Sequence, residues 1–452
     1  MLWHESLIDV ENDESADTGD LLEISDSFRC DLESVLKRFV ALHGGMAQRG
    51  DAWYASMKST VGGSELAALM GMSPYKGYYD VVAEKVAAMR GAPSWGGSTP
   101  TRWGTFFEDV IKGVVEADLG TTVVGDDICI RAAPGHRLSP DGFAVVRIYR
   151  RGDATAIWTT APADAALAPY AVPRIALLEF KCPWSRAPTL EVPRHYLPQV
   201  LAGLAVSPVA HFGVYVDAVF RKCAYADLGP TAAYDVAGHS TAAAPDTPPF
   251  AWGLAALYAP AFIESADLLY PSDGGDGDVA AFYATATGTT WAADSPPIDL
   301  GDVDDAVFGR ALALADRGRL TAAHYPPQFA DGRPAGRDPP AIDALRGGPG
   351  VPGVPGVPGV PGVPDAWLVA VLPWKLFDIS FVPVARRPGF FAEVAPVVAD
   401  VHRDAAAAIA SGDPAAYLRG RAAADPRGRR AGRATPRHAV SDTDVQALFD
   451  HA

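Results

Sequence analysis

The sequence predicts an α/β fold in which helices flank a central mixed β-sheet, with a long insertion in the core and disordered ends. Two observations support this fold class: apolar residues recur at helical spacing over 27–119, and strand-like apolar segments follow over 121–220. Hydrophobic residues make up 49% of the 452 residues, which is enough to bury a large core. No apolar run is long enough to cross a bilayer, so we expect no membrane-embedded segment.

The predicted helices rest on the spacing of apolar residues. Phe28, Leu32 and Phe39 repeat at helical intervals near the start of the core. The strongest pattern begins after Trp103 and places Phe107 on the apolar face. The predicted helices are 27–42, 78–89, 103–119, 197–207 and 392–409.

The predicted strands are short apolar segments between these helices. The one that matters most contains Glu179, Phe180, Lys181 and Cys182. Side chains alternate along a strand, so Glu179 and Lys181 should leave it on one side, while Phe180 and Cys182 point into a core. The predicted strands are 121–131, 143–150, 154–160, 174–182, 211–220 and 367–382.

Composition divides the chain into five parts. The first residues are acidic without periodicity, which is typical of disorder. The insertion is rich in Ala, Pro, Gly and Asp, with short helices predicted at 252–258, 261–269 and 304–316. It ends in a Val-Pro-Gly repeat over 351–364, which we interpret as a flexible linker because proline and glycine disfavour helices and central strands. The parts are a disordered N-terminus (1–26), the core (27–222), the insertion (223–365), a returning strand and helix of the core (366–412) and an Arg-rich disordered tail (413–452).

The net charge of −16 is unusual for a nucleic-acid-binding protein, because phosphate binding favours basic surfaces. The charge is uneven, however: the first 33 residues hold eleven acids, whereas seven arginines lie between Arg419 and Arg437. This basic tail could hold DNA, act as a nuclear import signal or only add solubility. The four cysteines have no paired spacing, which argues against a disulfide scaffold, a zinc ribbon or an iron–sulfur cluster and favours a reducing intracellular compartment.

Two short motifs carry the candidate chemistry. Ser139-Pro140-Asp141-Gly142 places a carboxylate at a turn, and Glu179 and Lys181 place a carboxylate beside an ammonium group. Carboxylates are the ligands that Mg²⁺ prefers, and a divalent ion near a lysine can activate water. Each motif alone has a simpler reading, because Glu-x-Lys is usually a solvated ion pair and Asp-Gly is commonly only a turn. Together they indicate metal-dependent hydrolysis of phosphodiesters.

In their order along the chain, these motifs resemble the PD-(D/E)XK nuclease superfamily. Within it, the chain is similar to the lambda exonuclease branch, which includes the YqaJ-type viral recombinases and the herpesvirus alkaline nucleases. The resemblance covers about 50–222 and, more weakly, 367–410. It implies a restriction-endonuclease-like sheet and makes 27–222 a nuclease core. The matching residues are Trp53, Gly63-Ser64-Glu65, Arg102-Trp103-Gly104 with Glu108, Ser139-Pro140-Asp141-Gly142, Leu178-Glu179-Phe180-Lys181-Cys182-Pro183, and Tyr196 with Gln199.

The resemblance implies a role for each residue of the metal site. Asp141, Glu179 and the backbone carbonyl of Phe180 would bind Mg²⁺, for which Mn²⁺ could substitute. Glu108 would bind a second ion directly or through water, unless it is only part of the polar face of its helix. Lys181 would orient the attacking water and help to deprotonate it.

The resemblance also suggests residues that contact DNA. Gln199 would position water or phosphate, and Ser64 resembles the residue that contacts the DNA 5′-phosphate. The alternative for Ser64 is an ordinary helix N-cap. An arginine usually precedes this serine by seven positions, but Met57 occupies that place, so the sequence leaves 5′-to-3′ polarity open. Candidates to line the DNA path are Lys58, Lys76, Arg102, Arg186 and Arg194.

With this resemblance, we expect a Mg²⁺-dependent deoxyribonuclease, with one or two ions, that degrades double-stranded DNA ends in viral or phage-type recombination and repair. The 5′-to-3′ direction is what the resemblance implies. The alternatives are a PD-(D/E)XK endonuclease or nickase, and a catalytically inactive DNA-binding relative. Kinship suggests a single-strand annealing protein as partner, and a monomer or a trimer. For a viral protein, we expect the host nucleus or cytoplasm.

Overall fold

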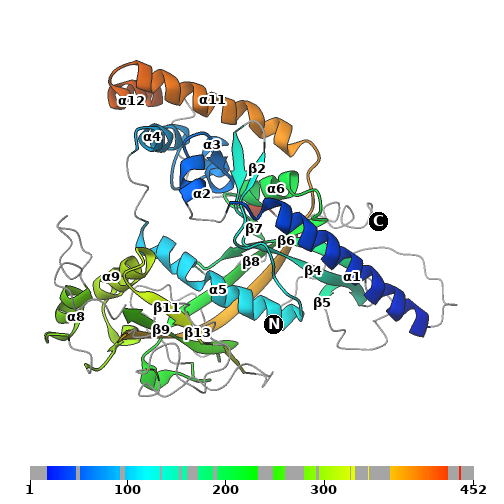
Figure 1. Ribbon diagram of the computed structural model, residues 1–452, viewed down its shortest axis with the longest axis vertical. Coiled ribbons are helices and arrows are strands. Elements are labelled where there is room, and N and C mark those ends of the chain that lie inside the picture. Colours follow the sequence, from blue (N-terminus) through cyan, green and yellow to red (C-terminus); the bar gives the residue numbers. More distant parts are fainter. Residues whose placement is uncertain are drawn as a thin grey trace.

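One β-sheet forms the centre of the protein, and helices cover both of its faces (Figure 1). The strand order is β11-β9-β13-β8-β6-β4-β5, in which β6 and β8 run parallel and the other neighbours along this path run antiparallel. The predicted mixed sheet flanked by helices is confirmed. The strands are β4 (Gly142–Arg151), β5 (Thr155–Thr159), β6 (Val172–Lys181), β8 (Phe212–Lys222), β9 (Ala251–Ala259), β11 (Thr321–His324) and β13 (Trp367–Val384).

This architecture is that of a computed structural model. The Val-Pro-Gly repeat and the helix predicted over 261–269 lie outside the residues that it describes. Among the described residues, no helix combines the length and the apolar character needed to cross a membrane. The described residues are 18–46, 51–91, 97–132, 135–151, 155–159, 172–186, 191–232, 248–259, 279–291, 295–325, 327–330, 345, 367–425 and 437–438.

The parallel pair β6 and β8 is joined through a helix. Parallel strands need a crossover connection, and α6 (Leu197–Val206) lies between them in the sequence and packs against β8. In the register of this pair, Lys181 on β6 is the neighbour of Asp217 on β8. The end of β6, which carries the Glu-x-Lys motif, therefore lies beside the middle of β8.

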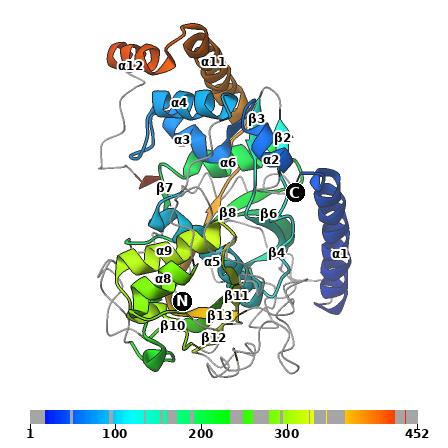
Figure 2. The ribbon, with the colours of Figure 1, turned by 60° about the vertical axis from the view of Figure 1, so that its left-hand side comes forward.

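The two faces of the sheet belong to separate hydrophobic cores. Alternation along β6 sends Leu178 and Phe180 into one core and Ile175 and Leu177 into the other. In Figure 2, α8 and α9 lie together with α5, apart from α4 and α11. The helices of the first core are α5 (Thr99–Leu119), α8 (Val279–Thr287) and α9 (Asp305–Asp316); those of the second include α1 (Thr18–His43), α4 (Tyr78–Met89), α6 and α11 (Phe390–Ala410).

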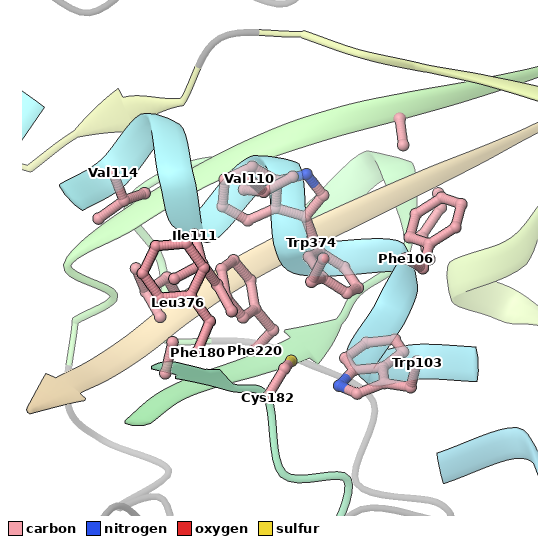
Figure 3. Close-up of a cluster of buried hydrophobic side chains, with 14 of the residues drawn as sticks. Trp103, Phe106, Val110, Ile111, Val114, Phe180, Cys182, Phe220, Trp374 and Leu376 are labelled. Atoms are coloured by element: carbon pink, nitrogen blue, oxygen red, sulfur yellow. The ribbon is translucent and has the colours of Figure 1, made fainter. Parts of the chain in front are cut away.

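Buried aromatic rings hold α5 on the sheet (Figure 3). The ring of Phe107 stacks on that of Phe220 from β8 with centroids 4.4 Å apart, and Trp374 of β13 meets Phe220 edge-on at 5.2 Å. Trp103, one turn earlier on α5, packs on Phe107 at 4.5 Å. Such pairs contribute about 0.5–1.5 kcal/mol each beyond the burial of their area. They fix the position of Glu108, the next residue on α5.

The described parts of the segment 223–365 belong to the core rather than to an appended insertion. Its strand β9 lies inside the central sheet between β13 and β11, and its helix α9 contacts α5. The helix predicted over 252–258 is wrong, because hydrogen bonds to strands on both sides override the helix propensity of the alanines in this stretch. The helix predicted over 304–316 is confirmed as α9.

Helices also extend into both ends that were predicted to be disordered. Helix α1 begins at Thr18, within the segment that was predicted to be disordered. Helix α12 (Pro414–Ala424) lies in the predicted tail, and the side chain of Asp413 caps it by accepting a hydrogen bond from Ala416 N–H at 3.0 Å. Disorder was predicted from composition, which does not register such caps and packing contacts.

Candidate active site

The two sequence motifs meet where β4 pairs with β6. Gly142 lies opposite Leu178 in this antiparallel ladder, which brings Asp141 to the end of β6. Oδ2 of Asp141 accepts a hydrogen bond from the backbone N–H of Phe180 at 2.6 Å. The backbone of β6 thus fixes the Asp141 carboxylate beside the strand that carries Glu179.

The glycine that follows Asp141 is required by the backbone at this point. Gly142 has a φ of +148°, which residues with side chains rarely adopt. A Cβ at this position would lie 2.3 Å from Cγ1 of Val123. A larger residue would therefore displace the turn and move the Asp141 carboxylate with it.

Glu179 and Lys181 lie on the same side of β6, as the alternation predicts. The Glu179 side chain is 1% exposed and that of Lys181 is 19% exposed. The Lys181 ammonium contacts Oε1 of Glu179 and donates a hydrogen bond to the backbone carbonyl of Phe180 at 3.0 Å. The Lys181 ammonium therefore neutralises part of the negative charge of this group of acids.

The electrostatics of this cluster follow from burial and from like charges. Burial, together with the carboxylates of Asp141 and Glu108, raises the pKa of Glu179 to about 8 against the opposing charge of Lys181. Burial alone would lower the pKa of Lys181, but the charges of Glu179 and Asp141 raise it above its usual range. The cluster therefore favours the presence of a cation.

Glu108, Asp141 and Phe180 line one pocket of about 60 Å³. Glu108 comes from the middle of α5 and the other two come from the paired strands, so the fold brings these predicted metal-site positions together. Lys112 and Asp126 line the same pocket and form an ion pair at 2.6 Å. Sequence reasoning missed both: Lys112 could have been found from its place one turn after Glu108, whereas no pattern marks Asp126.

The donor groups of this pocket suit a hard divalent cation, because they are all oxygen atoms. Within the described parts of the chain, no three His, Cys, Asp or Glu side chains stand close enough together to form a metal site by themselves. The backbone carbonyl of Phe180 adds a donor beside Glu179, and the Lys181 ammonium contacts both. This ammonium group supplies a positive charge beside these oxygen atoms.

Gln199 and Ser64 lie together at a second place, the turn before α3 (Leu66–Leu69). A Cβ on Gly63 would come 3.5 Å from Cγ of Gln199, so Gln199 packs on this turn. The prediction that Ser64 is the N-cap is wrong. Gly62 occupies that position, and its N–H is bound by the buried carboxylate of Glu65, which leaves Ser64 exposed.

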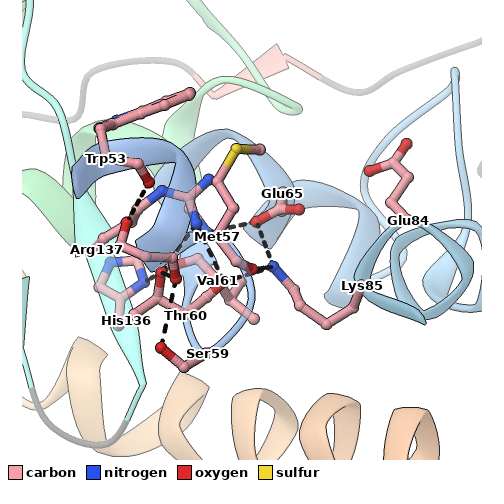
Figure 4. A network of polar contacts seen from close by, with 12 residues as sticks. Trp53, Met57, Ser59, Thr60, Val61, Glu65, Glu84, Lys85, His136 and Arg137 are labelled. Carbon is pink, nitrogen blue, oxygen red and sulfur yellow. Dashed lines mark hydrogen bonds and ion pairs between the residues drawn. The ribbon is translucent and has the colours of Figure 1, made fainter. Parts of the chain in front are cut away.

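Two buried cations hold the loop before this turn (Figure 4). Nζ of Lys85 donates hydrogen bonds to the carbonyls of Met57, at 2.8 Å, and Thr60. Nη1 of Arg137 donates to the carbonyl and the hydroxyl of Thr60, at 3.1 and 2.9 Å. Local sequence patterns miss both cations, because they come from distant elements: Lys85 from α4 and Arg137 from β3 (His136–Leu138). They place positive charge beside Met57, where the resemblance leads us to expect an arginine.

A hydrogen bond links this loop to the metal-site motif. Nε1 of Trp53 donates to Oγ of Ser139 at 3.1 Å, two residues before Asp141. The guanidinium of Arg137 lies 5.2 Å from the centroid of the Trp53 ring. The turn with Ser64 and the turn with Asp141 are therefore parts of one connected region.

The predicted DNA-contacting cations have different surroundings. Lys58 is exposed. The Arg102 side chain is only 14% exposed, and its Nε lies 3.4 Å from Oδ2 of Asp316 on α9. The Arg186 guanidinium pairs with Asp217, whose charge raises the pKa of Arg186 although burial opposes it. Arg102 and Arg186 are each already paired with an acid.

Asp217 is a further residue that sequence reasoning missed. It is fully buried on β8, next to Lys181 across the parallel pair, and binds Arg186 through both carboxylate oxygens. Arg186 also donates to the hydroxyl of Tyr215 at 2.9 Å. A single charged residue within the stretch 212–220 of β8 was the signal that could have identified it.

Known proteins share the region that holds this site. Residues 52–210 match the YqaJ-like viral recombinase domain. Protein D345L of the Pretoriuskop isolate of African swine fever virus is 28% identical over 363 residues, which are 79% of this chain and 85% of the relative. The corresponding protein of a Malawi isolate is 38% identical over 187 residues, 40% of this chain and 52% of the relative. A crystal structure of LHK-Exo in complex with dAMP aligns at 16% identity over 37% of this chain and 73% of that one, with a TM-score of 0.25.

Proposed function

Because residues 52–210 match the YqaJ-like viral recombinase domain, we propose that this protein is a Mg²⁺-dependent deoxyribonuclease that degrades double-stranded DNA ends during recombination. The observation that carries the proposal is the meeting of Asp141, Glu179 and Lys181 where β4 pairs with β6. Acids next to a lysine suit phosphodiester hydrolysis, since the acids can hold cations and the lysine can act on water and phosphate.

Each residue of the site has its own proposed role in hydrolysis. Asp141, Glu179, the carbonyl of Phe180 and Glu108 would hold one or two Mg²⁺ ions, with Mn²⁺ as a substitute. When bound, such an ion would polarise the phosphate and help to form hydroxide from water near neutral pH. Lys181 lies within reach of the same oxygen atoms, so its ammonium can orient the attacking water and neutralise charge on the phosphate.

We further propose that the turn at Ser64 receives the 5′ end of the DNA. Ser64 is exposed, while Lys85 and Arg137 hold the loop before it and supply the positive charge that Met57 lacks. Gln199 packs on the same turn and would position the phosphate. This arrangement supports 5′-to-3′ degradation. Duplexes with a 5′-phosphate should be degraded faster than duplexes with a 5′-hydroxyl, and equal rates would overturn the assignment.

The substrate and the setting follow from the proposed reaction. Double-stranded DNA ends are the substrate, and a single-strand annealing protein that takes up the exposed strand is the expected partner. The four cysteines are free thiols, which suits a reducing compartment such as the nucleus or cytoplasm of a host cell. Mixing the protein with a candidate annealing protein and measuring co-elution tests the partnership.

The decisive test compares linear and covalently sealed circular DNA in the presence of Mg²⁺ and of EDTA. We expect the purified protein to degrade linear duplexes from their ends with Mg²⁺, to leave sealed circles intact and to be inactive in EDTA. Efficient cutting of sealed circles would identify an endonuclease or nickase instead. Failure to cut either DNA would identify a DNA-binding relative without catalytic activity.

A further inference from the structure

One exposed aromatic side chain lies outside the pocket that Glu108 and Asp141 line. Tyr75 is 68% exposed, in the turn before α4. Oγ of Ser73 accepts hydrogen bonds from the backbone N–H groups of Tyr75 and Lys76, at 3.2 and 3.3 Å. The turn is therefore fixed by its own hydrogen bonds, and its backbone holds Tyr75 at the surface.

Tyr75 is the outer end of a row of rings. Its ring meets that of His195 edge-to-face with centroids 5.5 Å apart, and the His195 ring lies 4.1 Å from that of Tyr196. Tyr196 in turn stacks on Tyr215 at 5.7 Å. Nζ of Lys181 lies 5.3 Å from the centroid of the Tyr196 ring. The row thus runs from solvent to the lysine of the candidate active site.

His195 serves as an aromatic spacer in this row. Both of its ring nitrogens are shielded from solvent and have no hydrogen-bond partner among the described residues. Burial, followed by the charges of Arg186 and Lys181, lowers the pKa of His195 to about 4, so its ring is neutral near pH 7. A neutral ring without hydrogen bonds contributes packing only. The His195 ring therefore fills the space between the rings of Tyr75 and Tyr196.

Positive side chains border the exposed ring. Lys76 follows Tyr75 directly, with a side chain that is 30% exposed and that pairs with Glu84 at 2.8 Å. Arg194 is exposed next to His195. A ligand that combines flat rings with a chain of negative charges matches this surface. Single-stranded DNA has this chemistry, because an unpaired base can offer its face to an aromatic side chain while its phosphates approach cations. In a duplex, the neighbouring base pairs cover that face.

We propose that Tyr75 is a stacking platform for an unpaired nucleobase of a DNA strand next to the active site. A single exposed tyrosine needs no explanation by itself. The fixed turn, the row of rings and the path to Lys181 are what single out this one. The proposal rests on the proposed nuclease function and adds a binding site for single-stranded DNA to it.

The test measures binding without catalysis. A short single-stranded oligonucleotide with a 3′ fluorophore is titrated with protein in EDTA, and a matched oligonucleotide carries abasic sites. We expect Tyr75→Ala to weaken binding of the normal oligonucleotide about tenfold and to remove the preference over the abasic one. Tyr75→Phe should bind as the wild type does, because the ring is retained. Binding of Tyr75→Ala within twofold of the wild type, or an unchanged preference for bases, would overturn the proposal.

A control variant and a second readout separate this proposal from the nuclease proposal. Leu42, on α1, is another large exposed apolar side chain, at 77%, so Leu42→Ala should leave both affinities unchanged. Cleavage of linear duplex with Mg²⁺ is measured on the same protein samples. If the wild type does not cleave but Tyr75→Ala loses base-dependent binding, the nuclease proposal fails and the platform stands. If the wild type cleaves and the Tyr75 variants bind equally, only the platform fails.

Discussion

The ammonium group of Lys181 contacts the carboxylate of Glu179, two residues earlier on the same face of β6, and also binds the carbonyl of Phe180 between them. This contact places a cation among the oxygen atoms that are proposed to hold Mg²⁺. Because Glu179 is almost fully buried near Asp141, its negative charge needs such a partner. The same geometry allows Lys181 to act on a water or phosphate bound next to these oxygen atoms.

Replacing Asp141 by Asn should weaken binding of a divalent cation. The variant keeps an acceptor for Phe180 N–H but loses the negative charge that the pocket offers to a metal ion. We expect the affinity for Mn²⁺, measured by isothermal titration calorimetry, to fall by about tenfold or more. Asp400→Asn, which removes a surface partner of Arg403, is the control and should bind as the wild type does. Equal affinity of the two variants would exclude Asp141 as a ligand.

Replacing Gly142 by Ala should destabilise the fold and disturb the site together. The φ of +148° and the approach of a Cβ to Val123 predict a loss of about 2 kcal/mol or more in the free energy of unfolding. Gly420→Ala, in α12 with nothing within 4 Å of a Cβ, should instead be neutral or stabilising by up to about 1 kcal/mol. Urea denaturation measures both variants. A stable Gly142→Ala variant would contradict this turn geometry.

Replacing Asp217 by Asn should reveal the cost of breaking a buried ion pair. Asp217 is fully buried, whereas the Arg186 side chain is 31% exposed, so we expect a loss of about 3 kcal/mol, the low end for such pairs. The exposed pair of Arg387 and Glu393 is the matched control, and Glu393→Gln should cost less than about 1 kcal/mol. Equal losses in chemical denaturation would mean that the pair at Asp217 is accessible to water.

Acid should destabilise the protein partly through His136. Burial lowers the pKa of this residue to about 4, below its unfolded value of about 6.5. Between these values the unfolded state binds more protons, so stability falls as the pH decreases from 6.5 to 4, by at most roughly 3 kcal/mol for this group. His136→Asn keeps a donor for the Val61 carbonyl but cannot titrate.

The pH dependence of unfolding should therefore be shallower in His136→Asn than in the wild type. It should not vanish, because burial also lowers the pKa values of His195 and His324 to about 4. If the free energy of unfolding of His136→Asn and of the wild type changed equally with pH, the burial of an uncharged His136 would be contradicted.

Local sequence patterns predict the elements that hold the candidate metal site. Alternation along 174–182 correctly predicts that Glu179 and Lys181 leave β6 on the same side, and helical spacing predicts the helix of Glu108. These patterns succeed because each strand or helix needs one buried face, and the spacing of apolar residues within the element determines that face. The spacing of apolar residues does not predict that Asp141 and Glu179 lie together. The order of the motifs along the chain does.

Features that depend on distant contacts escape such patterns. The alanine-rich stretch 252–258 was predicted as a helix, but it is a strand because partners from far along the chain bind it on both sides. Arg137 donates a hydrogen bond to Thr60, which lies far away in the sequence, and the residues next to each of them in the sequence do not indicate this contact. Ser64 has the residue type of an N-cap, yet the buried carboxylate of Glu65 occupies the Gly62 N–H instead.

The most direct test of the proposed function is the rate at which linear duplex DNA is degraded with Mg²⁺ by the wild type and by Lys181→Ala. Lys37→Ala, which removes an exposed lysine of α1, serves as the control. We expect Lys181→Ala to be slower by about 10²–10⁴-fold, while it keeps the fold and Lys37→Ala keeps the wild-type rate. Equal rates for Lys181→Ala and the wild type would contradict catalysis at this site.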